Sequence, residues 1–277
     1  MASTRPHFRV ALGTSGGRPS LLLQSRRGIY RSGIPDVLER LLDVLDPSDV
    51  LDFALGPQDQ FWISYKSPRG RTYLTSEDLI DDLGLESSGK LRRLSLGGDY
   101  NFWAVTEDGS GHSSASWDIG SSELEDAISS LSESSALDDL KFLTLGNRDA
   151  YVYGTQSSLS WSGLHPSLTA LLRGAKRDDI QVSNVVLSPS HVDRWFVEFE
   201  NASVSYNLPG FDSAVISSHT SPDVSLRSTG GMVAPSMAVA KTSPAGGMTT
   251  LGVLKPNDHM YRTVSKLFYD GWKHASK

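Results

Sequence analysis

Short apolar runs alternate with polar turns along most of this chain, in a repeating order that predicts strand, strand, strand, helix. The first strand of each group carries five or six residues, in FRVAL (8–12), LDFAL (51–55), LRRLSL (91–96), LKFLTL (140–145) and VSNVVL (182–187). A turn rich in Gly, Asp, Asn or Pro follows each run. The next run is rich in aromatic and β-branched residues, as in FWISYK and WFVEFE, which favour strands.

The third strand of each group contains an aromatic residue that recurs at a nearly constant interval. These residues are Tyr30, Tyr73, Trp117, Trp161 and Tyr206, and the steps between them are 43, 44, 44 and 45 residues. The Leu-Gly pair that ends the first strand returns at a similar interval. Two markers with one period indicate five tandem copies of one unit.

The fourth element of each unit is predicted to be a helix. In the first unit Val37, Leu38, Leu41, Leu42 and Leu45 form an apolar stripe at helical spacing. The second unit repeats a shorter stripe with Leu79, Ile80 and Leu83, and the fifth unit, after Pro209, has the weakest helix pattern.

The pattern therefore predicts an α+β repeat protein with five tandem β-β-β-α units that close into a five-bladed, propeller-like ring. One unit cannot bury its own apolar faces, and closure hides sheet edges. The predicted repeat domain spans 7–216, with units at 7–47, 50–88, 91–135, 140–175 and 180–216. A Gly-, Ser- and Pro-rich extended tail follows at 217–277, and an apolar stripe from Asp258 onward predicts a helix at its end.

This order of elements resembles the five-fold α/β propellers, a group that includes guanidine-modifying enzymes and a non-enzymatic ribosome-associated factor. The resemblance covers about residues 7–216 and concerns element order, not a shared motif. Those enzymes use a nucleophilic cysteine, and this chain has no cysteine, so their chemistry does not carry over. Five-bladed lectin propellers have aromatic repeats of similar length but lack the helix.

Composition and charge disfavour several classes of function and location. The formal net charge is −6, and basic residues occur only in short clusters, which disfavours nucleic-acid binding. The N-terminus lacks the apolar segment of a signal peptide, and no run is long enough to cross a membrane, so we expect an intracellular, cytoplasmic protein.

Few residues form a recognisable catalytic pattern, and we predict no catalytic residues, metal site or cofactor. Gly13-Thr14-Ser15-Gly16-Gly17 matches the G-x-S-x-G pattern of a hydrolase nucleophile elbow, but the residues after it predict a strand where an elbow needs a helix. The seven histidines are scattered, with no metal-binding spacing.

The favoured function is a non-catalytic binding or interaction module that recognises a protein, a glycan or a small ligand. The five recurring aromatics, Tyr30, Tyr73, Trp117, Trp161 and Tyr206, are the predicted ligand-binding residues, because equivalent rings could form one belt or five pockets. The opposing interpretation is that they pack inside the repeats.

Two alternatives remain open at this point. An enzyme could use a central pocket, with Asp108, His112 and Ser113 in the long turn of the third unit as first candidates. Alternatively, the protein could be an adaptor that docks through its C-terminal tail.

Overall fold

The computed structural model describes residues 7–76, 79, 90–108, 110–133 and 139–220. The chain divides into two compact units, Met1–Ser225 and Leu226–Lys277, and every helix and strand named below lies in the first. The helix predicted from Asp258 onward lies outside the described residues.

The described strands form five antiparallel sheets, each built from three consecutive strands. The sheets, numbered 1 to 5 along the chain, are β1 (Arg9–Ser15), β2 (Arg18–Ser25) and β3 (Gly28–Ser32); β4 (Val50–Leu55), β5 (Phe61–Ser67) and β6 (Gly70–Thr75); β7 (Lys90–Leu96), β8 (Phe102–Glu107) and β9 (Ser113–Asp118); β10 (Leu140–Leu145), β11 (Tyr151–Thr155) and β12 (Leu159–Ser162); and β13 (Val182–Leu187), β14 (Trp195–Phe199) and β15 (Val204–Asn207). The predicted strand repeat is confirmed, and the fifth sheet takes no strand from the start of the chain.

Helices follow four of the sheets in the described part of the chain. They are α1 (Asp36–Val44), α3 (Ser122–Glu133), α4 (Pro166–Arg177) and α5 (Ser213–Thr220), and a short 3-10 helix, η1 (Pro47–Asp49), leads into β4. The stripe predicted for α1 is its buried face, since Leu38, Leu41 and Leu42 are buried. Of the helix predicted in the second unit, only Leu79 is described, and its side chain is buried.

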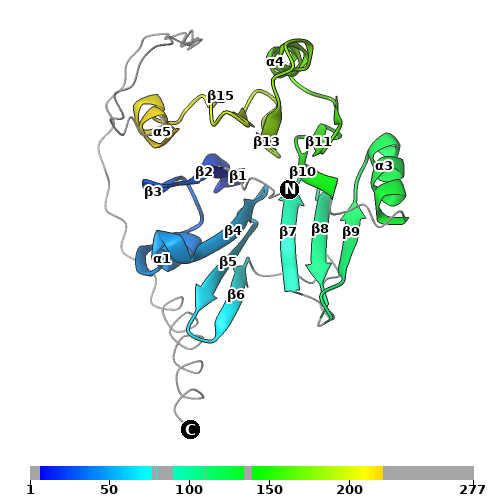
Figure 1. Ribbon diagram of the computed structural model, residues 1–277. Coiled ribbons are helices and arrows are strands. Elements are labelled where there is room, and N and C mark those ends of the chain that lie inside the picture. The colour runs from blue at the N-terminus through cyan, green and yellow to red at the C-terminus, as the bar shows by residue number, and fades with distance from the viewer. Residues whose placement is uncertain (1–6, 77–78, 80–89, 109, 134–138, 221–277) are drawn as a thin grey trace, which may run out of the picture. The chain divides into compact units, whose positions relative to one another are not determined.

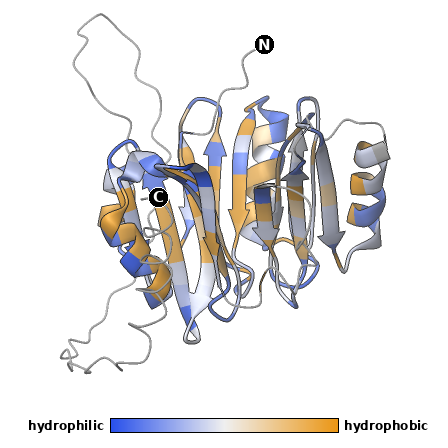
Figure 2. Cartoon of the chain, turned by 90° about the horizontal axis from the view of Figure 1, so that it is seen from below, coloured by the Kyte–Doolittle hydropathy of each residue, from blue (hydrophilic) through white to orange (hydrophobic). Residues whose placement is uncertain are grey.

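Neighbouring sheets share apolar cores, which explains why one unit could not fold alone. In the described residues each core joins one sheet to the next, as in Leu22 with Phe53, Trp62 with Leu96, Trp103 with Leu145, and Val152 with Val185. Within the compact unit Met1–Ser225, the first strand of every sheet faces the middle and the helices lie outside (Figure 1). Apolar residues follow the strands, while many turns are hydrophilic (Figure 2).

Sheets 1 and 5 are also neighbours, although they lie at opposite ends of the repeat. Phe8 meets Phe196 edge to face, with ring centroids 6.2 Å apart, and both belong to a core that includes Leu21 and Leu208. The backbone N–H of His7 donates to Glu198 Oε1 at 2.7 Å.

The first strands of sheets 2 to 5 each contain a bulge near their start. The pairing register shifts between Val50/Asp52, Leu91/Arg93, Leu140/Phe142 and Val182/Asn184. A bulge bends the strand and re-aims the side chains beside it. We call this region, residues 50–52, 91–93, 140–142 and 182–184 together with the unbulged Arg9, the bulge end.

Candidate binding site

The turns between the first and second strands of the five sheets lie at the end of the sheets opposite to the bulge end. We call this surface the turn face (residues 13–18, 56–60, 97–101, 146–150 and 188–194). In sheet 2 the Gly56 N–H donates to the Gln60 carbonyl (2.8 Å), and the Gln60 N–H donates to the Pro57 carbonyl (3.0 Å). The turns of sheets 3 and 4 repeat both bonds. The repeat therefore extends to the conformation of these turns.

Hydrogen bonds join each turn to the next, and the turn of sheet 5 to that of sheet 1. Between sheets 1 and 2, the Thr14 N–H donates to the Gly56 carbonyl (3.0 Å) and the Asp59 N–H donates to the Thr14 carbonyl (2.9 Å). The other links are the Tyr100 hydroxyl to Gln58 Oε1 (3.1 Å), the Gly98 N–H to the Gly146 carbonyl (2.8 Å), Asn147 Nδ2 to the Ser190 carbonyl (2.9 Å), and Thr14 Oγ1 with Ser190 Oγ (3.4 Å). Each turn is thus held in place by its neighbours.

Exposed residues of the turn face adopt a left-handed backbone that side chains seldom take. They are Gln58 (φ 51°), Asp59 (φ 68°), Asp99 (φ 53°), Tyr100 (φ 64°) and Arg148 (φ 55°). In sheets 2 and 3 both central residues have positive φ, as in type I′ hairpin turns, which favour Asn and Gly. Tyr100 in this conformation costs about 1–2 kcal/mol, and its side chain is 61% exposed, so burial does not offset that cost.

A pocket opens on the turn face between sheets 4 and 5. It is an open hollow whose volume of about 210 Å³ includes space open to solvent, and it is lined by apolar side chains together with Asn147, His165, Ser188, His191 and Arg194. Among the described residues, buried Arg194 Nε and Nη1 and His191 Nδ1 have no hydrogen-bond partner. The sequence pattern marks neither His191, one of the scattered histidines, nor Arg194 as a site residue.

The five recurring aromatics are not all equivalent. Trp117, Trp161 and Tyr206 each pair with the second residue of the neighbouring middle strand. Arg31 and Thr75 occupy the matching places in sheets 1 and 2, opposite Leu22 and Trp62. The prediction that all five aromatics occupy equivalent positions is therefore wrong for two of them. Tyr30 lies one residue before the equivalent position in sheet 1, and Tyr73 lies two residues before it in sheet 2. An offset of one residue turns the Tyr30 side chain to the other face of its sheet.

The structure brings only two of these aromatics to the same core. Tyr30 and Tyr206 pack in the core between sheets 5 and 1, where Tyr206 stacks on Phe196. Trp117 packs between sheets 3 and 4, Trp161 packs between sheets 4 and 5, and Tyr73 is 51% exposed. The role of the five residues in binding a ligand stays a prediction.

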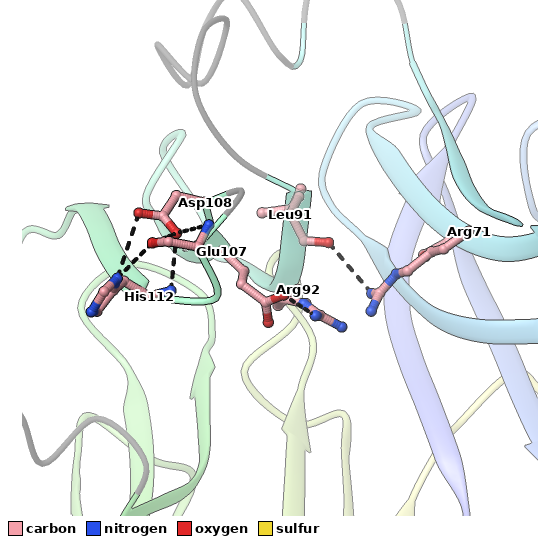
Figure 3. Close-up of polar contacts among 8 residues, drawn as sticks. Arg71, Leu91, Arg92, Glu107, Asp108 and His112 are labelled. Atoms are coloured by element: carbon pink, nitrogen blue, oxygen red, sulfur yellow. Dashed lines mark hydrogen bonds and ion pairs between the residues drawn. The ribbon is translucent and has the colours of Figure 1, made fainter.

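The long turn of the third unit forms a local hydrogen-bonded cluster (Figure 3). Asp108 Oδ1 accepts from the Ser110 N–H (2.8 Å), the Ser110 hydroxyl (2.6 Å) and the His112 N–H (3.0 Å). Ser110 Oγ also lies 2.6 Å from His112 Nδ1. The hydroxyl thus contacts the carboxylate directly, whereas a catalytic triad places the histidine between them. Ser113, the third candidate, begins β9 and pairs with Glu107.

The Asp108 carboxylate serves to hold this turn. The Ser110 hydroxyl, followed by the backbone N–H of His112, lowers the pKa of Asp108 below its ordinary value. The His112 side chain is 85% exposed, so no protein environment surrounds its ring. The cluster has the contacts of a polar turn.

Charged residues gather at and beside the bulge end of sheets 2 and 3. Arg92 pairs with Glu107, and Arg71 Nη2 donates to the Leu91 carbonyl at 3.4 Å (Figure 3). Burial raises the pKa of Asp52 to about 6, against the lowering effect of the Phe53 N–H and of nearby arginines. The bond from Arg71 to Leu91 crosses from sheet 2 to sheet 3, whereas the Arg92–Glu107 pair joins two strands of sheet 3.

Glu198 is the second carboxyl group with a raised pKa. Its side chain is fully buried between sheets 5 and 1, and among the described residues its Oε2 has no hydrogen-bond partner. Burial raises the pKa of Glu198 to about 7, although the N–H groups of His7 and Phe8 lower it. At neutral pH this group therefore exists in both protonation states.

The G-x-S-x-G segment has no helix after it. Ser15 ends β1, Arg18 begins β2 opposite it, and Gly16 and Gly17 form the turn between them. The segment is a hairpin, so it lacks the strand–turn–helix geometry of a nucleophile elbow.

The described residues offer neither a metal centre nor a membrane-spanning helix. They contain no group of three or more His, Asp or Glu side chains placed to hold a metal ion. None of their helices is long and apolar enough to span a membrane.

The turn face is therefore the surface where strained backbone, a pocket and buried polar atoms without partners occur together. Sequence comparison does not assign it to a family: no protein-family model matches the chain, and no curated protein matches it.

Proposed function

We propose that the first unit closes into a five-bladed ring and acts as a non-catalytic binding module whose turn face recognises a partner molecule. The core between sheets 5 and 1 and the bonds that join the five turns support closure. A ring would leave the turns together on one side, where loops on a fixed scaffold commonly carry function.

One observation carries the binding role: Tyr100 is held exposed in a left-handed conformation. Residues held in such strained conformations cluster at ligand-binding sites, because the surrounding structure supports a shape that the chain alone would avoid. Tyrosine also supplies a large contact area with a polar tip at little entropic cost, which suits recognition. Val192, 53% exposed, adds an apolar residue to the same face.

A pair of tyrosine variants tests this proposal. The full chain is screened on glycan, peptide and metabolite arrays, and each ligand found is titrated against Tyr100→Ser and Tyr73→Ser. Both tyrosines are exposed, but only Tyr100 belongs to the turn face. We expect Tyr100→Ser to weaken binding by about tenfold, equivalent to about 1.4 kcal/mol, and Tyr73→Ser to leave it unchanged.

The reverse result would reject the turn face as the binding surface. If only Tyr73→Ser weakens binding, the recurring aromatics are the site. If neither variant has an effect and every ligand found binds elsewhere, the turn face has no recognition role.

A further inference from the structure

We infer that the pocket between sheets 4 and 5 binds a small oxyanion, a phosphate or carboxylate group, through the guanidinium of Arg194. The inference rests on the proposed binding role of the turn face, and it names the chemistry that this part of the face recognises.

Arg194 carries a positive charge whose buried donors have no partner among the described residues. Its Nε and Nη1 are both enclosed and unbonded. A guanidinium stays protonated in proteins and offers a planar fork of N–H groups that matches an oxyanion. Leaving such donors unpaired in the interior costs more than leaving neutral ones. Protein atoms cover both nitrogens, so an anion that displaces part of this cover and bonds to the fork would remove that cost.

The turn that carries Arg194 is longer than its counterparts and is fixed at its base. It spans seven residues (188–194) between paired strands, against five (146–150) in sheet 4. The Ser188 N–H donates to the Arg194 carbonyl (3.0 Å), and the Arg194 N–H donates to the His191 carbonyl (3.2 Å). These bonds position His191 and Arg194 on the same pocket.

The opposite wall of the pocket is the start of α4. His165 caps this twelve-residue helix by accepting a bond from the Ser167 N–H (3.3 Å), and both His165 and Leu168 line the pocket. The N-terminus of a helix carries partial positive charge, which favours an anion nearby. The helix end and the unpaired guanidinium are independent features that favour the same sign of charge.

His191, another polar residue of the pocket, is compatible with an anion. His191 Nδ1 is buried and has no partner in the described part of the chain, so the ring could donate or accept a bond there. Burial, followed by the charge of Arg194, lowers the pKa of His191, while Asp193 raises it. The open hollow, whose volume of about 210 Å³ includes solvent space, is smaller than the pockets of about 300–1,000 Å³ that hold drug-sized ligands, so it suits a small group.

The test uses inorganic phosphate and acetate as probes on the full chain, with chloride at equal ionic strength as the reference. Binding is measured by calorimetry and by the shift of the Arg194 Nε–H resonance. We expect at least one probe to bind, and Arg194→Met to weaken it about tenfold or more, because a charge-assisted bidentate contact is lost. The matched control is Arg148→Met, which removes an exposed arginine from the same face and should change affinity less than about twofold.

Four results would overturn the inference. They are no binding of either probe above the chloride reference, equal affinity in Arg194→Met, an equal loss in Arg148→Met, or binding that leaves the Arg194 Nε–H resonance in place. Should Arg194→Met fail to fold, the resonance of the wild-type protein still decides between the outcomes. A partner that is sensitive to Tyr100→Ser while neither probe binds would reject the oxyanion and leave the proposed function intact.

Discussion

The turn face and the bulge end terminate the same five inner strands, yet they are stabilised differently. On the turn face, backbone groups bond directly to backbone groups between sheets 1 and 2 and between sheets 3 and 4, and Gly13, Gly56, Gly97 and Gly98 allow close approach. At the bulge end, long side chains span the gap, as when Arg93 Nη1 donates to the Leu140 carbonyl at 2.9 Å. The contact between sheets on the turn face depends on small residues, whereas the contact at the bulge end depends on long charged side chains.

This difference shows which contacts between sheets can vary from one repeat to the next. Side-chain contacts can change from sheet to sheet, so Arg9, Asp52, Arg93, Phe142 and Asn184 occupy matching places at the bulge end. Backbone contacts tolerate less change, and the turns of sheets 2, 3 and 4 keep one pattern of backbone bonds while their outward side chains differ. Diversity outside a constant backbone is the arrangement expected of a recognition surface.

The largest expected effect is a change of stability with pH that comes from Glu198, which lies in sheet 5 near the bulge end. Its folded-state pKa of about 7 lies above its ordinary value of 4.5, so between these values the folded protein holds a proton that the unfolded chain releases. Stability is therefore full below pH 4.5 and falls as pH rises to about 7. With about 1.4 kcal/mol for each pKa unit, the loss is roughly 3 kcal/mol.

Glu198→Gln should flatten this dependence, because the amide does not titrate. Urea unfolding from pH 4.5 to 8 measures it, and the variant should gain on the wild type steadily toward high pH. Glu200→Gln, a nearby and more exposed carboxylate, controls for the loss of one negative charge. Parallel curves for wild type and Glu198→Gln would contradict a carboxyl group perturbed by burial.

The next effect tests the backbone contacts of the turn face. A Cβ at Gly13 would lie 2.6 Å from the Gly56 carbonyl oxygen and 2.7 Å from Leu55 Cβ. We expect Gly13→Ala to destabilise the protein by about 1–3 kcal/mol, as overpacked sites do. Gly174→Ala, where a Cβ meets nothing within 4 Å in α4, should instead stabilise by about 0.5–1 kcal/mol. Equal denaturant midpoints for both variants would mean that the sheets do not approach closely at Gly13.

The fold was largely predictable because the repeat signals it five times. Apolar strand runs and turn residues recur with each unit, so a weak signal in one copy, such as the short helix α5, is supported by the others. The bulges were not predictable, because an extra residue such as Arg92 leaves the strand pattern readable in either register. Register also explains the error for Tyr30: constant spacing in sequence does not fix which residue a strand faces.

The candidate site was harder to predict because its signals are geometric. Gln58-Asp59 and Asp99-Tyr100 occupy the place of Gly16-Gly17, and an alignment of the five turns could have revealed bulky residues where glycine is expected. Nothing local in the sequence marks Arg194, since its unpaired donors result from the packing of its side chain in the folded protein. The pocket becomes visible only when sheets 4 and 5 are placed together.

A smaller effect of opposite sign is expected at Tyr100. Tyr100→Gly creates the Asp-Gly pair that type I′ turns prefer and should stabilise by about 0.5–1 kcal/mol, after the entropy of glycine in the unfolded chain offsets part of the relieved strain. The same variant should lose binding at the turn face. Thermal unfolding and ligand titration on one preparation measure both. Destabilisation would mean that the bond from the Tyr100 hydroxyl to Gln58 contributes more than the strain costs.

The smallest effect distinguishes the turn face from the polar turn of the third unit. His112 is exposed and its bonds are local, so His112→Ala should change stability by less than about 0.5 kcal/mol, as most surface substitutions do. It should also leave binding unchanged for every ligand that Tyr100→Ser weakens. Calorimetric titration of both variants with one ligand checks this. A comparable loss of affinity in His112→Ala would contradict a site confined to the turn face, because β8 separates these two ends of sheet 3.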